Sequence, residues 1–141
     1  RNLVGVLNEE VLGKGKYFLG ICIGMQVLAS RGVEFGEHAG LDFIQGDVLQ
    51  LEVNPVPHMG WNICRAIKAN SLVEEGFQEY FYFANSYHVV SEDASVVSMT
   101  TQCGFQMAAA LEKDNIFGLQ FHPERSFNAG LDLLKRFCLL D

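Results

Sequence analysis

The 141-residue sequence has no C-x-x-C pair, no long uninterrupted apolar run and fewer basic than acidic side chains. Its four cysteines are widely spaced, unlike those of a zinc cage or a thioredoxin-type redox pair. The 10 Lys and Arg residues against 17 Asp and Glu give a net charge of −7, which disfavours a surface that follows nucleic-acid phosphates. The sequence therefore predicts no metal site, no cofactor and no nucleic-acid partner.

Membrane-spanning and exported proteins are also disfavoured as classes. The longest apolar stretch, Tyr17 to Ala29, is interrupted by glycines and Gln26 and is too short to cross a bilayer. No signal-peptide pattern occurs at the start, and scattered thiols in a domain of this size suit a reducing compartment. We therefore predict a cytoplasmic protein without membrane contact. No repeat or linker divides the chain, so residues 1–141 are expected to form one domain.

The spacing of apolar residues predicts an α/β fold. A helix is expected over residues 3–11, a strand over residues 17–20 and a second helix over residues 25–29. Residues 31–40 should form a surface loop and residues 71–75 a single helical turn. Further strands are expected at 46–53, 61–67, 79–83, 88–90, 96–101, 107–112 and 116–121, before a C-terminal amphipathic helix from about Asn128. The predicted architecture is a parallel sheet flanked by helices, with an antiparallel extension.

One stretch, Gly20-Ile21-Cys22-Ile23-Gly24-Met25-Gln26, lies between the expected strand and the expected helix. Read as strand, tight turn and helix, it has the nucleophile-elbow pattern with cysteine in the place usually held by serine. Glycines on either side allow a sharp turn. A helix that starts after Cys22 would set unpaired N–H groups beside its sulfur and favour the thiolate. The alternative is a buried cysteine in a glycine-rich strand end.

A second motif, Phe121-His122-Pro123-Glu124, supplies a candidate base. The proline favours an extended backbone at His122, so His122 and Glu124, two residues apart, can project to one side. The carboxylate would fix the imidazole tautomer while the other ring nitrogen faces the sulfur. In isolation, a strand-end turn with a surface glutamate is the alternative. Both motifs on one chain favour catalysis.

Together the two motifs resemble those of the class I glutamine amidotransferases, whose Cys-His-Glu triad hydrolyses glutamine to glutamate and ammonia. Within that family, Pro57-His58-Met59-Gly60-Trp61-Asn62 is similar to a segment of the glutaminase subunit of imidazole glycerol phosphate synthase, an enzyme of histidine biosynthesis. The segment from Tyr82 to Tyr87 also follows that subunit's order. The resemblance extends from about Lys16 to Phe137, which is nearly the whole chain.

The resemblance implies a catalytic role for each of the matching residues. Cys22 would be the nucleophile, His122 the acid and base, and Glu124 the group that orients the imidazole. The backbone N–H of Ile23 would be one donor to the oxyanion, a role that the elbow geometry also favours.

The resemblance also implies binding roles. Gln26, Ser86 and Tyr87 would lie along the bound glutamine. Ammonia would pass to a (β/α)8 cyclase subunit, and Trp61 and Asn62 would lie toward that partner. The alternative for Trp61, the only tryptophan, is an ordinary core or rim aromatic.

Two departures from the family pattern bear on these expectations. Asn85 stands where the synthase subunit commonly has histidine, which changes the local hydrogen bonding. The sequence starts at Arg1 and has no counterpart of the family's first strand and glycine-rich loop, which gives the second oxyanion donor. Losing one such donor costs about a hundredfold to a thousandfold in turnover. The chain as given is therefore expected to be a partial domain, poorly active or unstable by itself.

Three other functions fit the same residues. A paralogous amidotransferase could feed ammonia to a different synthase, for example in sugar modification; Asn85 favours this, and the segment 57–62 opposes it. A non-catalytic binding subunit could keep the fold without turnover. A general thiol hydrolase is disfavoured, because Gln26 and the Ser86-Tyr87 pair suit glutamine.

Overall fold

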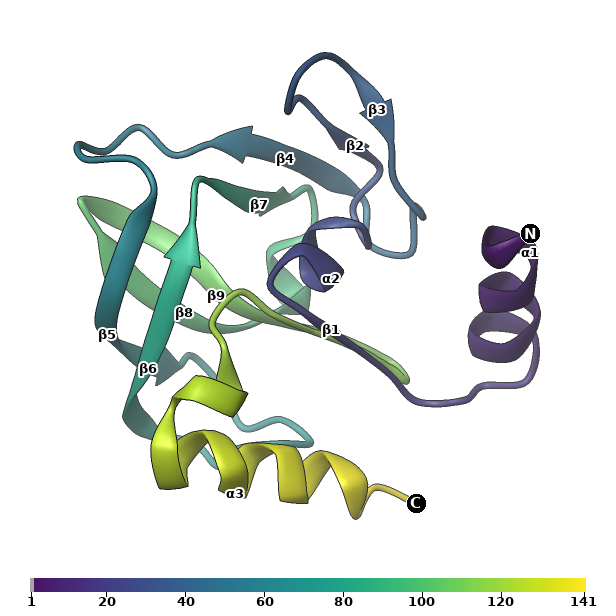
Figure 1. Cartoon of the computed structure of the whole chain (residues 1–141). Coiled ribbons are helices and arrows are strands. Elements are labelled where there is room, and N and C mark those ends of the chain that lie inside the picture. The colour runs from purple at the N-terminus through teal and green to yellow at the C-terminus, as the bar shows by residue number, and fades with distance from the viewer. Residues whose placement is uncertain (1) are drawn as a thin grey trace.

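The computed structural model describes residues 2–141, and its largest element is a six-stranded sheet (Figure 1). In this sheet β1 and β10 are parallel neighbours, and every other adjacent pair is antiparallel. In spatial order the strands are β1 (Phe18–Ile21), β10 (Ile116–Leu119), β9 (Phe105–Lys113), β8 (Val97–Cys103), β5 (His58–Ala66) and β6 (Gln78–Asn85).

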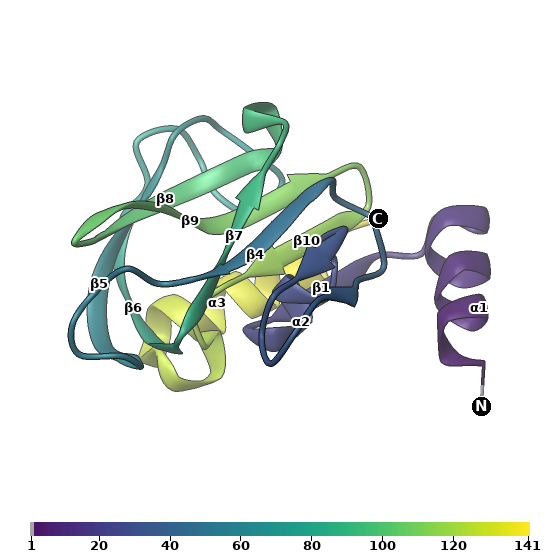
Figure 2. The same ribbon diagram turned by 90° about the horizontal axis from the view of Figure 1, so that it is seen from above.

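A smaller four-stranded sheet packs beside the first (Figure 2). Its strands, in spatial order, are β3 (His38–Ala39), β2 (Arg31–Gly32), β4 (Gly46–Gln50) and β7 (Tyr87–Ser91). In this sheet β2 and β4 are parallel, and the other two pairs are antiparallel. The chain passes from the large sheet to the small one at Ser86, the single residue between β6 and β7.

Helices lie on both faces of the parallel β1–β10 pair. The short helix α2 (Ile23–Gln26) packs between the two sheets, and α3 (Phe127–Cys138) covers the opposite face of the large sheet (Figure 1). At the start of the chain, α1 (Leu3–Leu7) continues into a π-helical turn (Asn8–Gly13). Two 3-10 turns complete the elements, at Ala94–Val96 and Pro123–Arg125.

Strand β10 is buried on both faces because its alternate residues enter different cores. Ile116 packs in the core that contains Met25, whereas Leu119 packs in the core that contains Leu133 of α3. Gly118 leaves no room for a side chain, since a Cβ there would lie 2.8 Å from Cγ of Met25. Each large apolar side chain buried in this way contributes about 1.5–3 kcal/mol. The strand is therefore a fixed support for the residues that follow it.

The predicted α/β architecture is confirmed, with helices on either side of the parallel pair and a larger antiparallel part. Two local predictions were wrong. Residues 31–40, expected to be a loop, contain β2 and β3. Residues 71–75, expected to be a helical turn, are irregular, because the side-chain oxygen of Asn70 accepts from the N–H groups of Leu72 (2.9 Å) and Val73 (3.0 Å). Asparagine commonly competes with helix formation in this way.

The helix after Cys22 is shorter than expected and ends at Gln26. The carbonyl oxygens of Val27, Leu28 and Ala29 accept hydrogen bonds of 2.8, 3.0 and 3.2 Å from N–H groups within residues 41–44. Because these carbonyls are satisfied by a later segment of the chain, the helix does not continue. That segment leads into β4.

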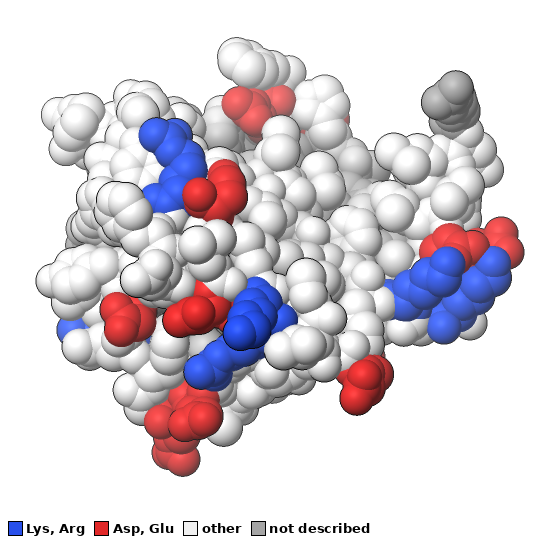
Figure 3. All heavy atoms as spheres, turned by 60° about the horizontal axis from the view of Figure 1, so that its bottom comes forward, with Lys and Arg blue, Asp and Glu red and all other residues white. Residues whose placement is uncertain are grey.

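Basic and acidic side chains occur beside one another on the face shown in Figure 3. Among the ion pairs of the described residues, Lys14 lies 3.1 Å from Glu9, and Arg31 lies 3.0 Å from Glu37. Exposed pairs of this kind add little to stability. Within residues 2–141, no helix has the length and hydrophobicity needed to cross a membrane.

Candidate active site

Cys22 occupies a sharp turn between β1 and α2. Its backbone has φ +53° and ψ −108°, a conformation that costs a residue with a side chain about 1–3 kcal/mol. A glycine is required two residues earlier, since a Cβ at Gly20 would lie 2.2 Å from the carbonyl oxygen of Gly24. The positive φ of this turn falls on the cysteine itself and not on Gly20 or Gly24. The turn projects Cys22 beyond the end of β1.

The second motif reaches the same edge of the sheet because β1 and β10 are parallel. Ile21 pairs with Leu119, and the N–H of Cys22 donates to the carbonyl of Leu119 at 2.7 Å. His122 follows three residues later in an extended conformation, φ −99° and ψ 95°. The carboxyl ends of neighbouring parallel strands meet at one edge, where α/β proteins commonly place their ligand sites.

His122 and Glu124 contact each other directly. The imidazole Nδ1 lies 2.7 Å from Oε1 of Glu124, so Nε2 is the ring nitrogen left for other partners. The N–H of His122 donates to the carbonyl of Tyr82 at 2.8 Å, which fixes the backbone beneath the ring. This arrangement is a base held by an orienting carboxylate.

Besides the N–H of Ile23, the sulfur of Cys22 has a backbone carbonyl and a side-chain amide beside it. It lies 3.9 Å from the carbonyl oxygen of Ala84 and 3.9 Å from Nε2 of Gln120. Within residues 2–141, no hydrogen bond joins the sulfur to His122. The thiol therefore rests against a backbone carbonyl, and it has to turn away from that oxygen to engage the imidazole.

The pKa of Cys22 is raised above its ordinary value, chiefly by burial. The N–H of Ile23 lowers this pKa, as the sequence suggested, but not enough to offset burial, and the negative charge of Glu124 raises it further. The expectation that the following helix favours the thiolate is therefore only partly correct. In the resting structure the protonated thiol is favoured.

A cavity of about 180 Å³ lies next to the elbow. Ile23 and Gln26, both predicted to contact substrate, line it together with Glu34 and His38. Neither Glu34 nor His38 was picked out from the sequence as functional. In the sequence, Glu34 is only an acidic residue in the segment after the elbow helix. Its position on the cavity wall follows from the placement of the β2–β3 segment beside that helix.

Ser86 and Tyr87 lie at the corner between β6 and β7 and do not line this cavity. The carbonyl oxygen of Tyr87 accepts from Nε2 of Gln26 at 3.0 Å and from Nδ2 of Asn85 at 3.0 Å. Asn85 is buried, and its Oδ1 has no hydrogen-bond partner among the described residues. The corner is therefore joined to the elbow through Gln26.

Trp61 is on the surface of β5 and is 43% exposed. Its ring stacks on Phe127, with centroids 5.2 Å apart, and meets Tyr82 edge-on at 5.7 Å. The side chain of Asn62, in contrast, is occupied within the fold: Oδ1 lies 3.0 Å from the ring Nε2 of His58, and Nδ2 donates to the carbonyl of Gln102. Of the two predicted interface residues, Trp61 presents the larger free surface.

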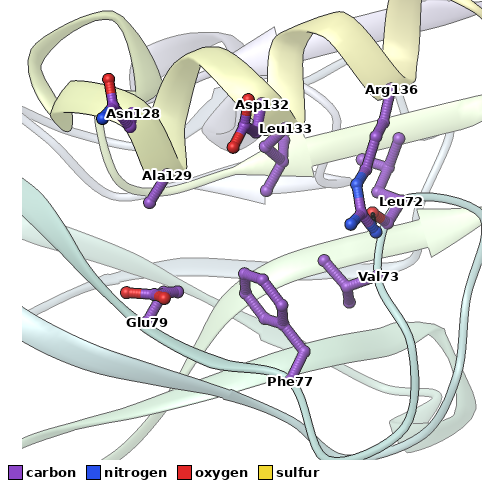
Figure 4. Close-up of a pocket in the computed structure, with 9 residues that line it drawn as sticks. All are labelled: Leu72, Val73, Phe77, Glu79, Asn128, Ala129, Asp132, Leu133 and Arg136. Atoms are coloured by element: carbon purple, nitrogen blue, oxygen red, sulfur yellow. Dashed lines mark hydrogen bonds between the residues drawn. The ribbon is translucent and has the colours of Figure 1, made fainter.

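A larger cavity, of about 380 Å³, lies between α3 and the segment before β6 (Figure 4). Figure 4 shows Arg136 at one end, Glu79 toward the other and Phe77 between them, with Asp132 on the α3 side above Phe77. Nη1 of Arg136 donates to the carbonyl of Leu72 at 3.1 Å. None of the predicted site residues lines this cavity. Within residues 2–141, no group of three or more His, Cys, Asp or Glu side chains is arranged to hold a metal ion.

The family described as Glutamine amidotransferase class-I matches residues 6–140. Among curated proteins, the chain is 42% identical to the imidazole glycerol phosphate synthase subunit HisH of Salinibacter ruber, covering 99% of this chain and 68% of that protein. It is 47% identical to the HisH subunit of Methanothermobacter thermautotrophicus, over 93% and 68% of the two chains. The HisH subunit of Zymomonas mobilis is 46% identical, over 96% and 65%. The chain thus spans about two thirds of the length of these relatives.

Two solved structures show the same fold. A glutamine amidotransferase from Thermotoga maritima has a TM-score of 0.62 at 20% identity, covering 96% of this chain and 55% of that one. A second structure, described as a glutamine amidotransferase, has a TM-score of 0.70 at 16% identity, over 97% and 69%. At these identities the likeness is one of architecture.

Proposed function

The chain belongs to the class I glutamine amidotransferases, among the HisH subunits of imidazole glycerol phosphate synthase, and we propose that it hydrolyses glutamine to glutamate and ammonia. The observation that carries this proposal is the meeting of two motifs at one sheet edge. Cys22 sits on a strained turn after β1, and the His122–Glu124 pair follows the parallel neighbour β10.

Cys22 is the proposed nucleophile. Its thiol turns from the carbonyl of Ala84 toward Nε2 of His122, which accepts the proton. The sulfur then attacks the side-chain carbonyl of glutamine, and the imidazolium donates its proton to the departing ammonia. Water hydrolyses the resulting thioester with His122 as the base. Glu124 holds Nδ1 throughout and stabilises the imidazolium.

The negative charge that develops on the substrate oxygen needs hydrogen-bond donors. The N–H of Ile23 already faces the sulfur of Cys22 and lowers its pKa. Because the attacked carbon lies next to that sulfur, this N–H is placed to donate to the oxyanion as well.

Glutamine is proposed to occupy the 180 Å³ cavity beside the elbow. Gln26 would contact the substrate there, and Glu34 would hold its α-ammonium group, because a carboxylate on the cavity wall complements that charge. Ser86 and Tyr87 would act from the β6–β7 corner, which is joined to the cavity through Gln26.

The ammonia is proposed to pass to a (β/α)8 cyclase subunit, giving a heterodimer with lyase activity in histidine biosynthesis. This assignment draws on the relatives, which are subunits of imidazole glycerol phosphate synthase. The exposed stack of Trp61 on Phe127 is the proposed contact surface, with Asn62 fixing the strand beneath it. Cytoplasmic location is proposed because Cys22, Cys64, Cys103 and Cys138 are all free thiols.

Labelling with a glutamine-analogue electrophile tests the proposal. We expect rapid modification of Cys22, protection by glutamine, and little reaction at the other three thiols in the folded chain. Ammonia release from glutamine should be measured in parallel, with the cyclase subunit present. If Cys22 is neither labelled nor needed for ammonia release, the chain is a non-catalytic subunit and the proposal is wrong.

A further inference from the structure

Gln120 is a fully buried polar residue next to the nucleophile. Its side chain is 0% exposed, and an amide buried without partners is costly. Its oxygen accepts from Nε2 of Gln26 at 3.3 Å, and its Nε2 lies 3.9 Å from the sulfur of Cys22. In the sequence, only its position two residues before His122 distinguishes this residue.

The direction in which the Gln120 amide points is fixed by the backbone. The carbonyl of Tyr87 can only accept hydrogen bonds, so Gln26 must turn its NH2 group toward it. The same NH2 group then faces Gln120, which must present its oxygen to Gln26 and its own NH2 to Cys22. Asn85 donates to the same Tyr87 carbonyl and supports this orientation. The sulfur consequently faces a donor.

The Ala84 carbonyl and the Gln120 amide have opposite effects on the ionisation of the Cys22 sulfur. The Ala84 carbonyl accepts from the protonated thiol and repels a thiolate, whereas the Gln120 N–H group stabilises a thiolate. Among the charged groups near the sulfur, Glu124 opposes ionisation, and it also holds the ring of His122. The N–H of Ile23 lowers the pKa of the thiol, and the Gln120 N–H group is a second donor placed beside the sulfur.

We propose that Gln120 orients the nucleophile and stabilises its thiolate, through a buried amide chain that runs from the Tyr87 carbonyl through Gln26 to the sulfur of Cys22. The effect of Gln120 on turnover rests on the proposed glutaminase function. The effect of Gln120 on the Cys22 thiol does not, so each of the two proposals can be contradicted without the other.

The test is the rate at which iodoacetamide alkylates Cys22 as a function of pH, measured on the Cys22 peptide by mass spectrometry. Gln120→Met keeps the volume but removes the donor. Loss of one hydrogen bond to a charged group should slow alkylation at neutral pH about tenfold and move the midpoint upward by about one pH unit. Gln120→Glu, which replaces the donor with a carboxylate oxygen, should move the midpoint further.

Thr101→Val is the matched control, because Thr101 is also buried and its Oγ1 donates to the carbonyl of Ile63 at 2.8 Å. It should leave the alkylation profile unchanged. The proposal is overturned if Gln120→Met has the wild-type profile, or shifts it no more than Thr101→Val does.

A second measurement needs no buried substitution at Gln120. In the unaltered chain, the ¹⁵N resonance of the Gln120 side-chain amide should titrate together with the Cys22 thiol, and it should stay constant with pH in Cys22→Ala. The proposal is also overturned if the ¹⁵N chemical shift of the Gln120 amide does not change when the Cys22 thiol ionises. Absence of glutamine hydrolysis beside a normal Gln120 effect would instead contradict the proposed function alone.

Discussion

Cys22 and Cys64 lie in regions of opposite character. Cys22 follows a parallel strand on a turn with φ +53°, and its neighbour Ile23 lines a cavity, whereas Cys64 lies inside antiparallel β5 and is 0% exposed. Burial raises the pKa of both thiols, far more for Cys64. Only Cys22 has an imidazole–carboxylate pair at the same sheet edge. The candidate nucleophile is therefore the cysteine in the turn after a strand. The cysteine that is hydrogen-bonded within the sheet is a packing residue.

The largest expected difference between the two cysteines is in turnover. Cys22→Ala should lower glutamine hydrolysis by about 10⁴-fold or more, since it removes the nucleophile. Cys64→Ala should leave turnover within about twofold per folded molecule. Ammonia release in the presence of the cyclase measures both. Loss of activity in a folded Cys64→Ala variant would contradict the contrast between the two cysteines. As a control, cyclase activity with added ammonium shows that the partner is intact.

The next largest expected difference is in the KM for glutamine, between substitutions of Glu34 and Glu79, which line different cavities. Glu34→Gln removes the proposed partner of the substrate ammonium and should raise the KM for glutamine about tenfold to a hundredfold, with a smaller change in kcat. Glu79→Gln, in the larger cavity under α3, is the matched control and should leave KM unchanged. Equal effects of the two substitutions would mean that the small cavity does not hold glutamine.

The dependence of stability on alkaline pH should differ between variants at Cys64 and at Cys22. Because the folded pKa of Cys64 is raised far above its ordinary value of 9.0, only the unfolded chain loses this proton just above pH 9. The free energy of unfolding should therefore be constant below pH 9 on this account, and fall above it by about 1.4 kcal/mol per pH unit. Urea unfolding from pH 8 to pH 11 should show a shallower fall in Cys64→Ala. Cys22→Ala should change this slope less.

The smallest expected effect is on stability: the difference between the glycine and alanine variants should have opposite signs at positions 22 and 64. At position 22 glycine relieves the backbone strain, so Cys22→Gly should be more stable than Cys22→Ala by about 1 kcal/mol. At position 64, within a strand, Cys64→Gly should be less stable than Cys64→Ala by about 0.5–1 kcal/mol. Denaturant unfolding of the four variants measures both differences. The same sign at both positions would remove the evidence for strain at Cys22.

The sequence could predict features set by neighbouring residues. The turn at Cys22 and the extended backbone at His122 follow from the local glycine and proline patterns, and the alternation of β10 follows from its apolar run. The irregular path at residues 71–75 was missed because a single side-chain oxygen, that of Asn70, captures the N–H groups a helix would need.

Contacts between distant residues were not predictable in the same way. Glu34 reaches the cavity because β2 and β3 fold beside α2, and nothing within residues 31–40 indicates that. Gln120 meets Cys22 because parallel pairing brings positions about a hundred residues apart to one edge. The raised pKa of Cys22 likewise depends on burial by the whole fold, so the local helix alone suggested the opposite direction.

The exposed stack of Trp61 on Phe127 gives the molecule an optical reporter. Trp61 is the sole tryptophan, so the indole fluorescence of the chain comes from one place on its surface. A protein that covers this surface will displace water from the ring and shift its emission toward the blue, whereas a small ligand in the cavity beside Cys22 will leave the colour unchanged. Assembly and substrate binding can therefore be followed as separate signals without an attached dye.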